Sequence, residues 1–195
     1  MAKLCSKGGD KLNENDRRTR RTQKSIRDNF IDLMSVMPIE EITIQKLTDK
    51  ADINRRTFYL HDEDIYDLLH KTEDFVMNRF GEILKDFEPP NEESDIGPQF
   101  FKVVMSYIED NQKMIGVLCR NPDSELMQKL IQLTVTNGQQ VIPFSNQEEA
   151  EYILNYCCWG MVGVLHTAMR KKDFDITKLS NLADKLLIST IEIDK

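Results

Sequence analysis

Apolar residues recur at steps of three and four along almost the whole chain, and this spacing limits most strongly what the sequence can form. Near the N-terminus Ile26, Phe30 and Leu33 would lie together on one face of a helix. Strand-like alternation is absent apart from the brief segment TVTNGQQVIPF, which we assign to a helix end and a loop. The pattern therefore predicts an all-α fold of about nine helices.

The expected helices are separated by recognisable stop and start signals. A first helix runs from about Arg17 to Val36 and is stopped by Pro38. Two very short helices follow, and Thr43 and Asn54 are suitable N-caps for them. The proline- and acid-rich segment EPPNEESDIGP is the clearest break in the chain. The remaining helices are expected near residues 63–87, 99–110, 112–120, 123–140, 147–170 and 177–191.

Charge is divided unevenly along the chain, whose net charge is −7. Residues 1–61 carry thirteen basic and nine acidic residues, whereas residues 62–195 carry thirteen basic and twenty-four acidic residues. A polyanion would be attracted to the N-terminal part and repelled by the rest, although a solvated helix start would look the same. The densest basic stretch consists of Arg17, Arg18, Arg20, Arg21, Lys24 and Arg27.

Composition indicates a globular protein, with 40% hydrophobic and 30% charged residues. The longest apolar run, Trp159 to Leu165, is far shorter than the ~20 residues of a membrane span, so we expect no membrane association. The N-terminal residues contain no apolar signal-peptide segment. Four scattered cysteines, two of them adjacent, indicate free thiols and a cytoplasmic location.

The two short helices are joined as tightly as a helix–turn–helix requires. Leu47, Ala51, Ile53 and Phe58 supply the apolar or small side chains that would pack this pair against the first helix. The second short helix then exposes side chains that can donate to phosphates and to base edges in a major groove. These residues are Asn54, Arg55, Arg56, Thr57, Tyr59 and His61.

This segment resembles the helix–turn–helix of the TetR family of transcriptional regulators (the TetR/AcrR type), which reads T-x-x-x-[IL]-A-x-x-A-G-[VI]-[ST]-x-x-x-[FL]-Y-x-[HY]-F-x-x-K. The resemblance covers about residues 20–69, without an insertion. The rest of the chain is similar to the family in length and layout only. The matching residues are Thr43, Leu47, Ala51, Ile53, Phe58, Tyr59 and His61.

The chain departs from the family pattern at five positions. Asp52 stands in place of the turn glycine, and aspartate tolerates left-handed geometry better than most residues. Thr48 replaces alanine, and Asn54 replaces serine or threonine. Asp62 replaces a phenylalanine that docks the second short helix, and Ile65 replaces a lysine that contacts phosphate. A lost lysine weakens binding to any DNA sequence, which Arg55 and Arg56 could offset.

The resemblance implies a homodimeric transcriptional regulator of the repressor type that binds a pseudo-palindromic double-stranded DNA operator. It predicts a flexible tail over residues 1–16, a DNA-binding domain over 17–69, and a regulatory and dimerisation domain over 70–195. A small-molecule or protein effector bound to the C-terminal domain would switch operator affinity. The expected DNA-binding residues are Thr43, Gln45, Asn54, Arg55, Arg56, Thr57, Tyr59 and His61, with Tyr59 and His61 on phosphates.

The C-terminal helices suggest both an interface and a pocket. Ile153, Cys157, Gly160, Val164 and Ala168 form one apolar face, continued by apolar residues of 179–191, and either dimer contact or burial in the monomer would explain it. Methionine and aromatic side chains of the same domain belong first to the core, and some are expected to line an effector pocket. The pocket residues predicted in this way are Phe101, Met105, Met127 and Trp159.

Other classes of function find less support. Cys157, Cys158 and His166 lie on one predicted helix, but their spacing fits no metal-ligand pattern, and no cofactor is expected. Because nucleophile elbows, phosphate-cradling glycine loops and His-Glu metal motifs are all missing, we expect neither catalytic residues nor enzymatic activity. The remaining alternative is a protein-binding adaptor or coactivator that keeps the TetR-like fold; Asp62 and Ile65 are the residues that favour it.

Overall fold

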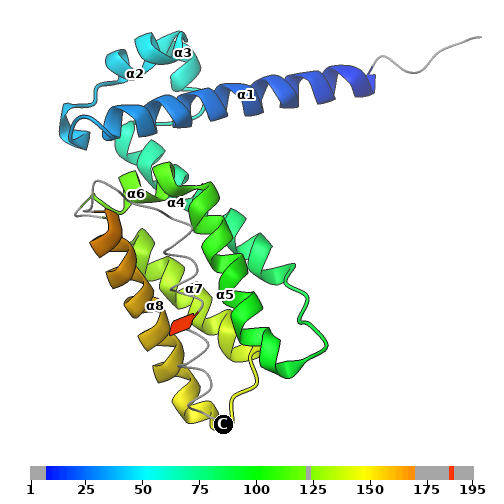
Figure 1. Ribbon diagram of the computed structural model, residues 1–195. Coiled ribbons are helices and arrows are strands. Elements are labelled where there is room, and N and C mark those ends of the chain that lie inside the picture. The colour runs from blue at the N-terminus through cyan, green and yellow to red at the C-terminus, as the bar shows by residue number, and fades with distance from the viewer. Residues whose placement is uncertain (1–7, 122–123, 170–184, 187–195) are drawn as a thin grey trace, which may run out of the picture. The chain divides into compact units, whose positions relative to one another are not determined.

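The structure, a computed structural model, describes residues 8–121, 124–169 and 185–186 (Figure 1). As the apolar periodicity predicts, the fold is all-α: within these ranges there are eight α-helices, one short 3-10 helix and no strand. The predicted helix over 177–191 lies outside the described residues, except for 185–186. Among the described residues, none of the helices combines the length and apolar character needed to cross a bilayer.

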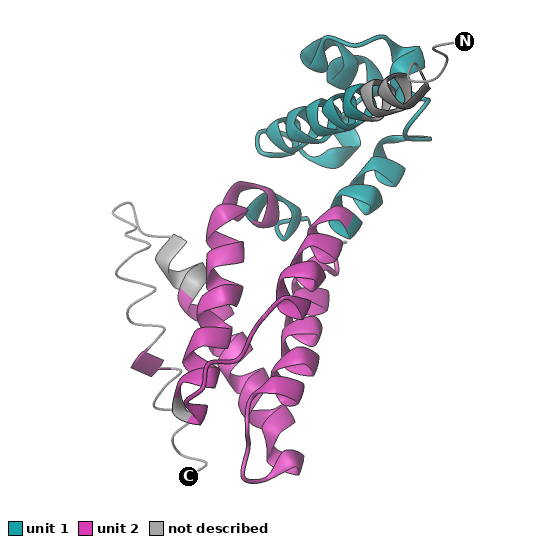
Figure 2. Cartoon of the chain, turned by 90° about the vertical axis from the view of Figure 1, so that its right-hand side faces the viewer, with its two compact units in different colours: residues 1–74, 116–121 teal, residues 75–115, 122–195 magenta. Residues whose placement is uncertain are grey.

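The chain divides into two compact units (Figure 2). The first unit comprises the residues up to Asp74 together with Gly116–Asn121, and the second comprises Phe75–Ile115 and the residues from Pro122 onward. Two helices, α4 (Ile65–Lys85) and α6 (Gln112–Leu118), therefore contribute residues to both units. These two helices are therefore continuous from one unit into the other.

The first unit is built on the long helix α1 (Gly8–Met34). Its buried face carries Ile26 and Phe30, which are 1% and 0% exposed, and α2 packs against this helix. The helix begins at Gly8 and not near Arg17, so residues 8–16 are helical where the sequence analysis placed a flexible tail. Residues 10–16 contain neither glycine nor proline to stop the helix, and they lack the apolar period by which it could have been predicted.

Helices α2 (Ile44–Ala51) and α3 (Arg55–Phe58) form the helix–turn–helix, preceded by a 3-10 turn (Ile39–Glu41). Both predicted N-caps are confirmed. The Thr43 side chain accepts a hydrogen bond from the Lys46 N–H at 3.2 Å, and Asn54 accepts one from the Arg56 N–H at 2.8 Å. Each bond satisfies an amide left without a partner at a helix start, which allows such short helices to begin at defined residues.

The turn between α2 and α3 depends on Asp52, which has φ 52° and ψ 48°. Among the described residues it is the only non-glycine residue with positive φ. Leu47 and Phe58, on either side of the turn, are completely buried, whereas Ala51 and Ile53 are half-buried. The left-handed residue therefore reverses the chain so that α2 and α3 present their apolar residues to one core.

Replacing this aspartate tests the strain in the turn. We expect Asp52→Gly to raise the free energy of unfolding by about 0.5–1 kcal/mol, because glycine adopts the left-handed conformation without a Cβ penalty. Asp52 is exposed, so the substitution removes no core contact. Asp52→Ala is the matched control and should lower stability. Urea unfolding of the three proteins measures the difference, and a more stable alanine variant would contradict the expectation.

The second unit contains the rest of α4, then α5 (Glu93–Asp110), α7 (Leu126–Val141) and α8 (Gln147–Met169). Helices α7 and α8 pack closely at Gly138, where an added Cβ would lie 3.2 Å from Leu154 and 3.3 Å from Phe100. The absence of a side chain at Gly138 thus sets the distance between the two helices. Phe100 and Leu154 are themselves completely buried, so this contact lies at the centre of the unit.

Helix α5 begins earlier than the sequence predicts. It starts at Glu93, not near residue 99, and includes Pro98. Glu93 and Asp95 lie in its first turn, where acidic side chains interact favourably with the helix dipole. The break that the sequence predicted over EPPNEESDIGP is therefore shorter, and the helix includes Pro98 as its sixth residue at the cost of one backbone hydrogen bond.

Candidate functional site

The exposed surface of α2 and α3 carries most of the residues predicted to contact DNA. Thr43, Gln45, Asn54, Arg55 and Arg56 are exposed. Tyr59 is 58% exposed, while Thr57 and His61 are half-buried. Helices α2 and α3 contact each other, so all eight residues belong to one short stretch at one side of the first unit (Figure 1).

Arg55 and Arg56 open α3 directly after its cap. Both side chains are exposed, and in the described part of the chain neither guanidinium forms an ion pair. The cap uses the Asn54 side-chain oxygen. Two arginines at the exposed start of a helix can bind anionic oxygens or guanine edges without first breaking an internal salt bridge.

Tyr59 is positioned by its neighbour in the core. Its ring meets the ring of Phe58 edge-on, with centroids 5.6 Å apart and an interplanar angle of 81°. Because Phe58 is completely buried, this contact fixes the tyrosine while leaving more than half of it exposed. Gln45, by contrast, donates to the carboxylate of Asp49 one turn later on α2, a bond that would have to break before Gln45 could contact DNA.

Leu60 was not predicted as a surface residue of this site, yet it is 73% exposed beside Tyr59. An exposed aliphatic side chain is chemically suited to packing against a thymine methyl group. The sequence offered no signal for it, since leucine in a helical segment is expected to be buried.

Asp62 is buried where the family pattern has phenylalanine. It is 6% exposed, and its carboxylate lies 3.6 Å from Lys71 Nζ on α4. The same ammonium donates to the His61 carbonyl at 2.6 Å and to the Asp67 carboxylate at 2.7 Å. An ion-pair network centred on Lys71 thus joins the segment after α3 to α4, in the role that the pattern gives to an aromatic side chain. Ile65 is 7% exposed and belongs to the core.

The pKa values of two carboxyl groups around Lys71 shift in opposite directions. Burial raises the pKa of Asp62 above its ordinary value, and the attraction of Lys71 only partly reverses this. The hydrogen bond from Lys71, helped by the Glu63 N–H, lowers the pKa of Asp67. Lys71 has a raised pKa for the same reason, since it gains a hydrogen bond from pairing with Asp67. Keeping Asp62 ionised in the folded protein therefore lowers the free energy of unfolding.

The raised pKa of Asp62 predicts that the stability of the fold depends on pH. A carboxyl group whose folded pKa is raised destabilises the fold at neutral pH, and the penalty disappears as the pH falls through the raised value toward the ordinary one. We therefore expect Asp62→Asn to be more stable than the wild type at pH 7 and to lose this advantage toward pH 4, as measured by thermal unfolding. Asp74→Asn, an exposed position on α4, is the matched control. A variant that is less stable than the wild type at pH 7, with a difference that shrinks as the pH falls, would show instead that the charge itself holds α4.

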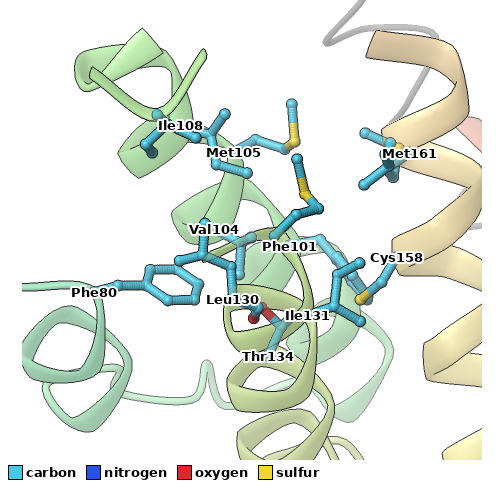
Figure 3. A pocket seen from close by; sticks show the side chains of 13 residues that line it. Phe80, Phe101, Val104, Met105, Ile108, Leu130, Ile131, Thr134, Cys158 and Met161 are labelled. Atoms are coloured by element: carbon cyan, nitrogen blue, oxygen red, sulfur yellow. The ribbon is translucent and has the colours of Figure 1, made fainter. Parts of the chain in front are cut away.

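A second feature, a cavity, lies wholly within the second unit (Figure 3). It has a volume of about 70 Å³ and is lined from α4, α5, α6, α7 and α8. Phe101, Met105 and Met127, three of the four predicted pocket residues, line it. Trp159 does not line this cavity and is instead 50% exposed on α8.

One wall of the cavity is fixed by a polar contact. The ring of Phe80 on α4 stacks on Tyr107 with centroids 5.1 Å apart. The Tyr107 hydroxyl donates to the Val76 carbonyl at 2.7 Å, and burial raises its pKa to about 12, so it remains a donor at any physiological pH. This contact ties α5 to α4 and holds Phe80 in place.

The exposed side of α8 carries an aromatic face consisting of Tyr152, Tyr156 and Trp159, which are 78%, 71% and 50% exposed. Next to them, a Cβ added at Gly160 or Gly163 would meet no atom within 4 Å. Cys157, which the sequence analysis placed on the apolar dimer face, is buried within the chain. The open face of α8 is therefore rotated by about one residue from the predicted one.

Metal and thiol chemistry have no clear site in the described residues. They contain no group of three or more metal-ligating side chains. Burial raises the pKa of Cys119 and Cys157 to about 11, and that of Cys158, which also feels Cys157, to about 12. These thiols remain protonated at neutral pH and are poor nucleophiles.

Comparison with known proteins adds no family to this description. No protein-family model matches the chain, and no curated protein sequence matches it either.

Proposed function

We propose that this chain is a DNA-binding transcriptional regulator of the TetR type, which binds its operator through α2 and α3. The observation that carries the proposal is the start of α3, where the capped helix presents two exposed and unpaired arginines. The exposed basic residues of α1, from Arg17 to Arg21, add positive charge to the same unit. The acidic remainder of the chain disfavours binding of a polyanion elsewhere.

In this proposal an effector acts through the two helices that the units share. Phe80 of α4 and Ile115 of α6 both line the cavity of the second unit. Each helix continues into the first unit, where α4 also carries Lys71, the partner of Asp62. A ligand that favours one position of α4 or α6 would therefore change the population of DNA-binding conformations.

The aromatic face of α8 supports a homodimer. Three large aromatic side chains exposed on one helix form a surface of the kind that protein–protein interfaces use. Two copies joined there would present two helix–turn–helix units to a pseudo-palindromic operator, whose half-sites lie about one duplex turn apart.

Binding of the full-length protein to duplex DNA from the region flanking its own gene tests the proposal. Fluorescence anisotropy across a salt series should give sequence-preferential binding with a steep salt slope, since each phosphate contact releases counterions. The second candidate is a protein-binding adaptor. It is favoured by Ile65, a buried residue at the position where the TetR pattern has a phosphate-contacting lysine. Binding to a partner protein with no DNA affinity at low salt would support the adaptor and overturn the regulator.

A further inference from the structure

The cavity of the second unit has an unusually uniform lining. Among the described residues, thirteen line it, and these include no acidic, basic or histidine side chain; the wall that they form is almost entirely carbon and sulfur. The one hydroxyl belongs to Thr134, which donates to the Leu130 carbonyl in its own helix at 2.8 Å. The one thiol belongs to Cys158 and stays protonated because burial raises its pKa to about 12. In the part of the chain that the structure describes, no lining group can neutralise a charged ligand.

We propose that this cavity binds a small, uncharged, apolar molecule of the size of a single aromatic ring, and excludes carboxylates and amines. Placing an ion there would remove its hydration without an opposite charge in exchange. An apolar cavity instead contains no water, and binding of an apolar ligand in it is favourable. The role of this ligand as an effector rests on the function proposed above, whereas its chemical class rests on the lining alone.

The cavity can accommodate such a ligand only if side chains of its wall move. A cavity of roughly 150 Å³ binds benzene, and this one measures about 70 Å³. Met105, Met127 and Met161 supply the required adaptability, because an unbranched thioether with three rotatable bonds can change rotamer at little cost (Figure 3). Phe80, in contrast, is held by Tyr107 and gives a fixed wall.

The full chain labelled with ¹³C at its methionine methyl groups gives a direct test. Three of the nine methionines line the cavity, so toluene should shift the signals of Met105, Met127 and Met161 and leave that of Met34 unchanged. Benzoate, which has nearly the same shape but carries a charge, should produce no shift at the same concentration. Equal shifts with benzoate, or no shift with toluene, would overturn the proposal.

Two variants locate the binding. Val104→Phe fills the cavity and should abolish the toluene shifts, whereas Thr134→Val keeps the volume, removes the hydroxyl, and should leave them unchanged. If Val104→Phe does not fold, as judged by far-ultraviolet circular dichroism, Thr134→Leu serves as the filling variant. Contacts between the three methionine methyls and residues 179–191 in the ligand-free protein would mean that the chain fills its own cavity, which also overturns the proposal.

These outcomes are independent of the DNA experiment. Toluene binding is measured without DNA, so a protein that binds its operator but not toluene has the proposed function and a different ligand. A protein that binds toluene but no DNA keeps the cavity assignment and loses its role as an effector site.

Discussion

Replacing Arg55 and Arg56 together by alanine is expected to lower operator affinity by roughly 10²–10³-fold, the largest effect of any change at the surface of the first unit. A bidentate contact with guanine contributes about 1–3 kcal/mol of discrimination, and a phosphate contact contributes about one unit of the salt slope. Both side chains are exposed and unpaired in the described chain, so the variant removes binding groups without exposing a buried partner. Fluorescence anisotropy on operator and random DNA at two salt concentrations measures both quantities.

The single variants separate the two roles. We expect Arg55→Ala to weaken operator and random DNA alike and to reduce the salt slope, and Arg56→Ala to weaken the operator preferentially. Arg79→Ala is the matched control, because Arg79 is an exposed arginine of the second unit that pairs with Glu82 at 3.4 Å. If the double variant binds DNA as the wild type does, α3 is not a DNA-reading helix and the adaptor becomes the better proposal.

The local signals of the helix–turn–helix were sufficient to predict its caps and its turn. Thr43 and Asn54 cap the two helices, and Asp52 adopts the left-handed conformation expected of a residue in the turn. Each of these features is decided within about four residues, by a side chain bonding to a nearby amide or by the sterics of one Cβ. Such short-range determinants can be read from a single sequence.

The features that the sequence did not predict depend on contacts between segments. Asp62 pairs with Lys71, nine positions further along the chain, and the local sequence around either residue does not identify its partner. The orientation of α8 is similar. Cys157 and Tyr156 are adjacent, and only packing against α7 decides that the cysteine is buried and the tyrosine exposed. A rotation of about one residue about the helix axis exchanges the two faces, and apolar periodicity cannot resolve it on a helix rich in apolar residues throughout.

That orientation leads to the second large effect, on assembly. Tyr156→Asp places a charge in the centre of the aromatic face of α8 and is expected to convert a dimer into a monomer of 22.7 kDa. Tyr156 is 71% exposed in the single chain, so the substitution leaves the core of the second unit intact. Gln128→Asp, at an exposed position on α7, adds the same charge elsewhere and is the matched control. Light scattering at micromolar concentration distinguishes the two states.

DNA binding should also reveal the loss of the dimer, because only binding to a duplex with two half-sites depends on it. Linking two DNA-binding units makes the second contact intramolecular, which raises avidity by roughly 10²–10⁴-fold without any new contact. Tyr156→Asp should therefore lose about that factor on a duplex with two half-sites and lose nothing on a duplex with one. Equal losses on both duplexes would mean that the substitution damages the DNA-binding unit itself. A wild-type chain that is already monomeric, or a variant that stays dimeric with unchanged affinity, would remove the aromatic face of α8 from the proposed interface.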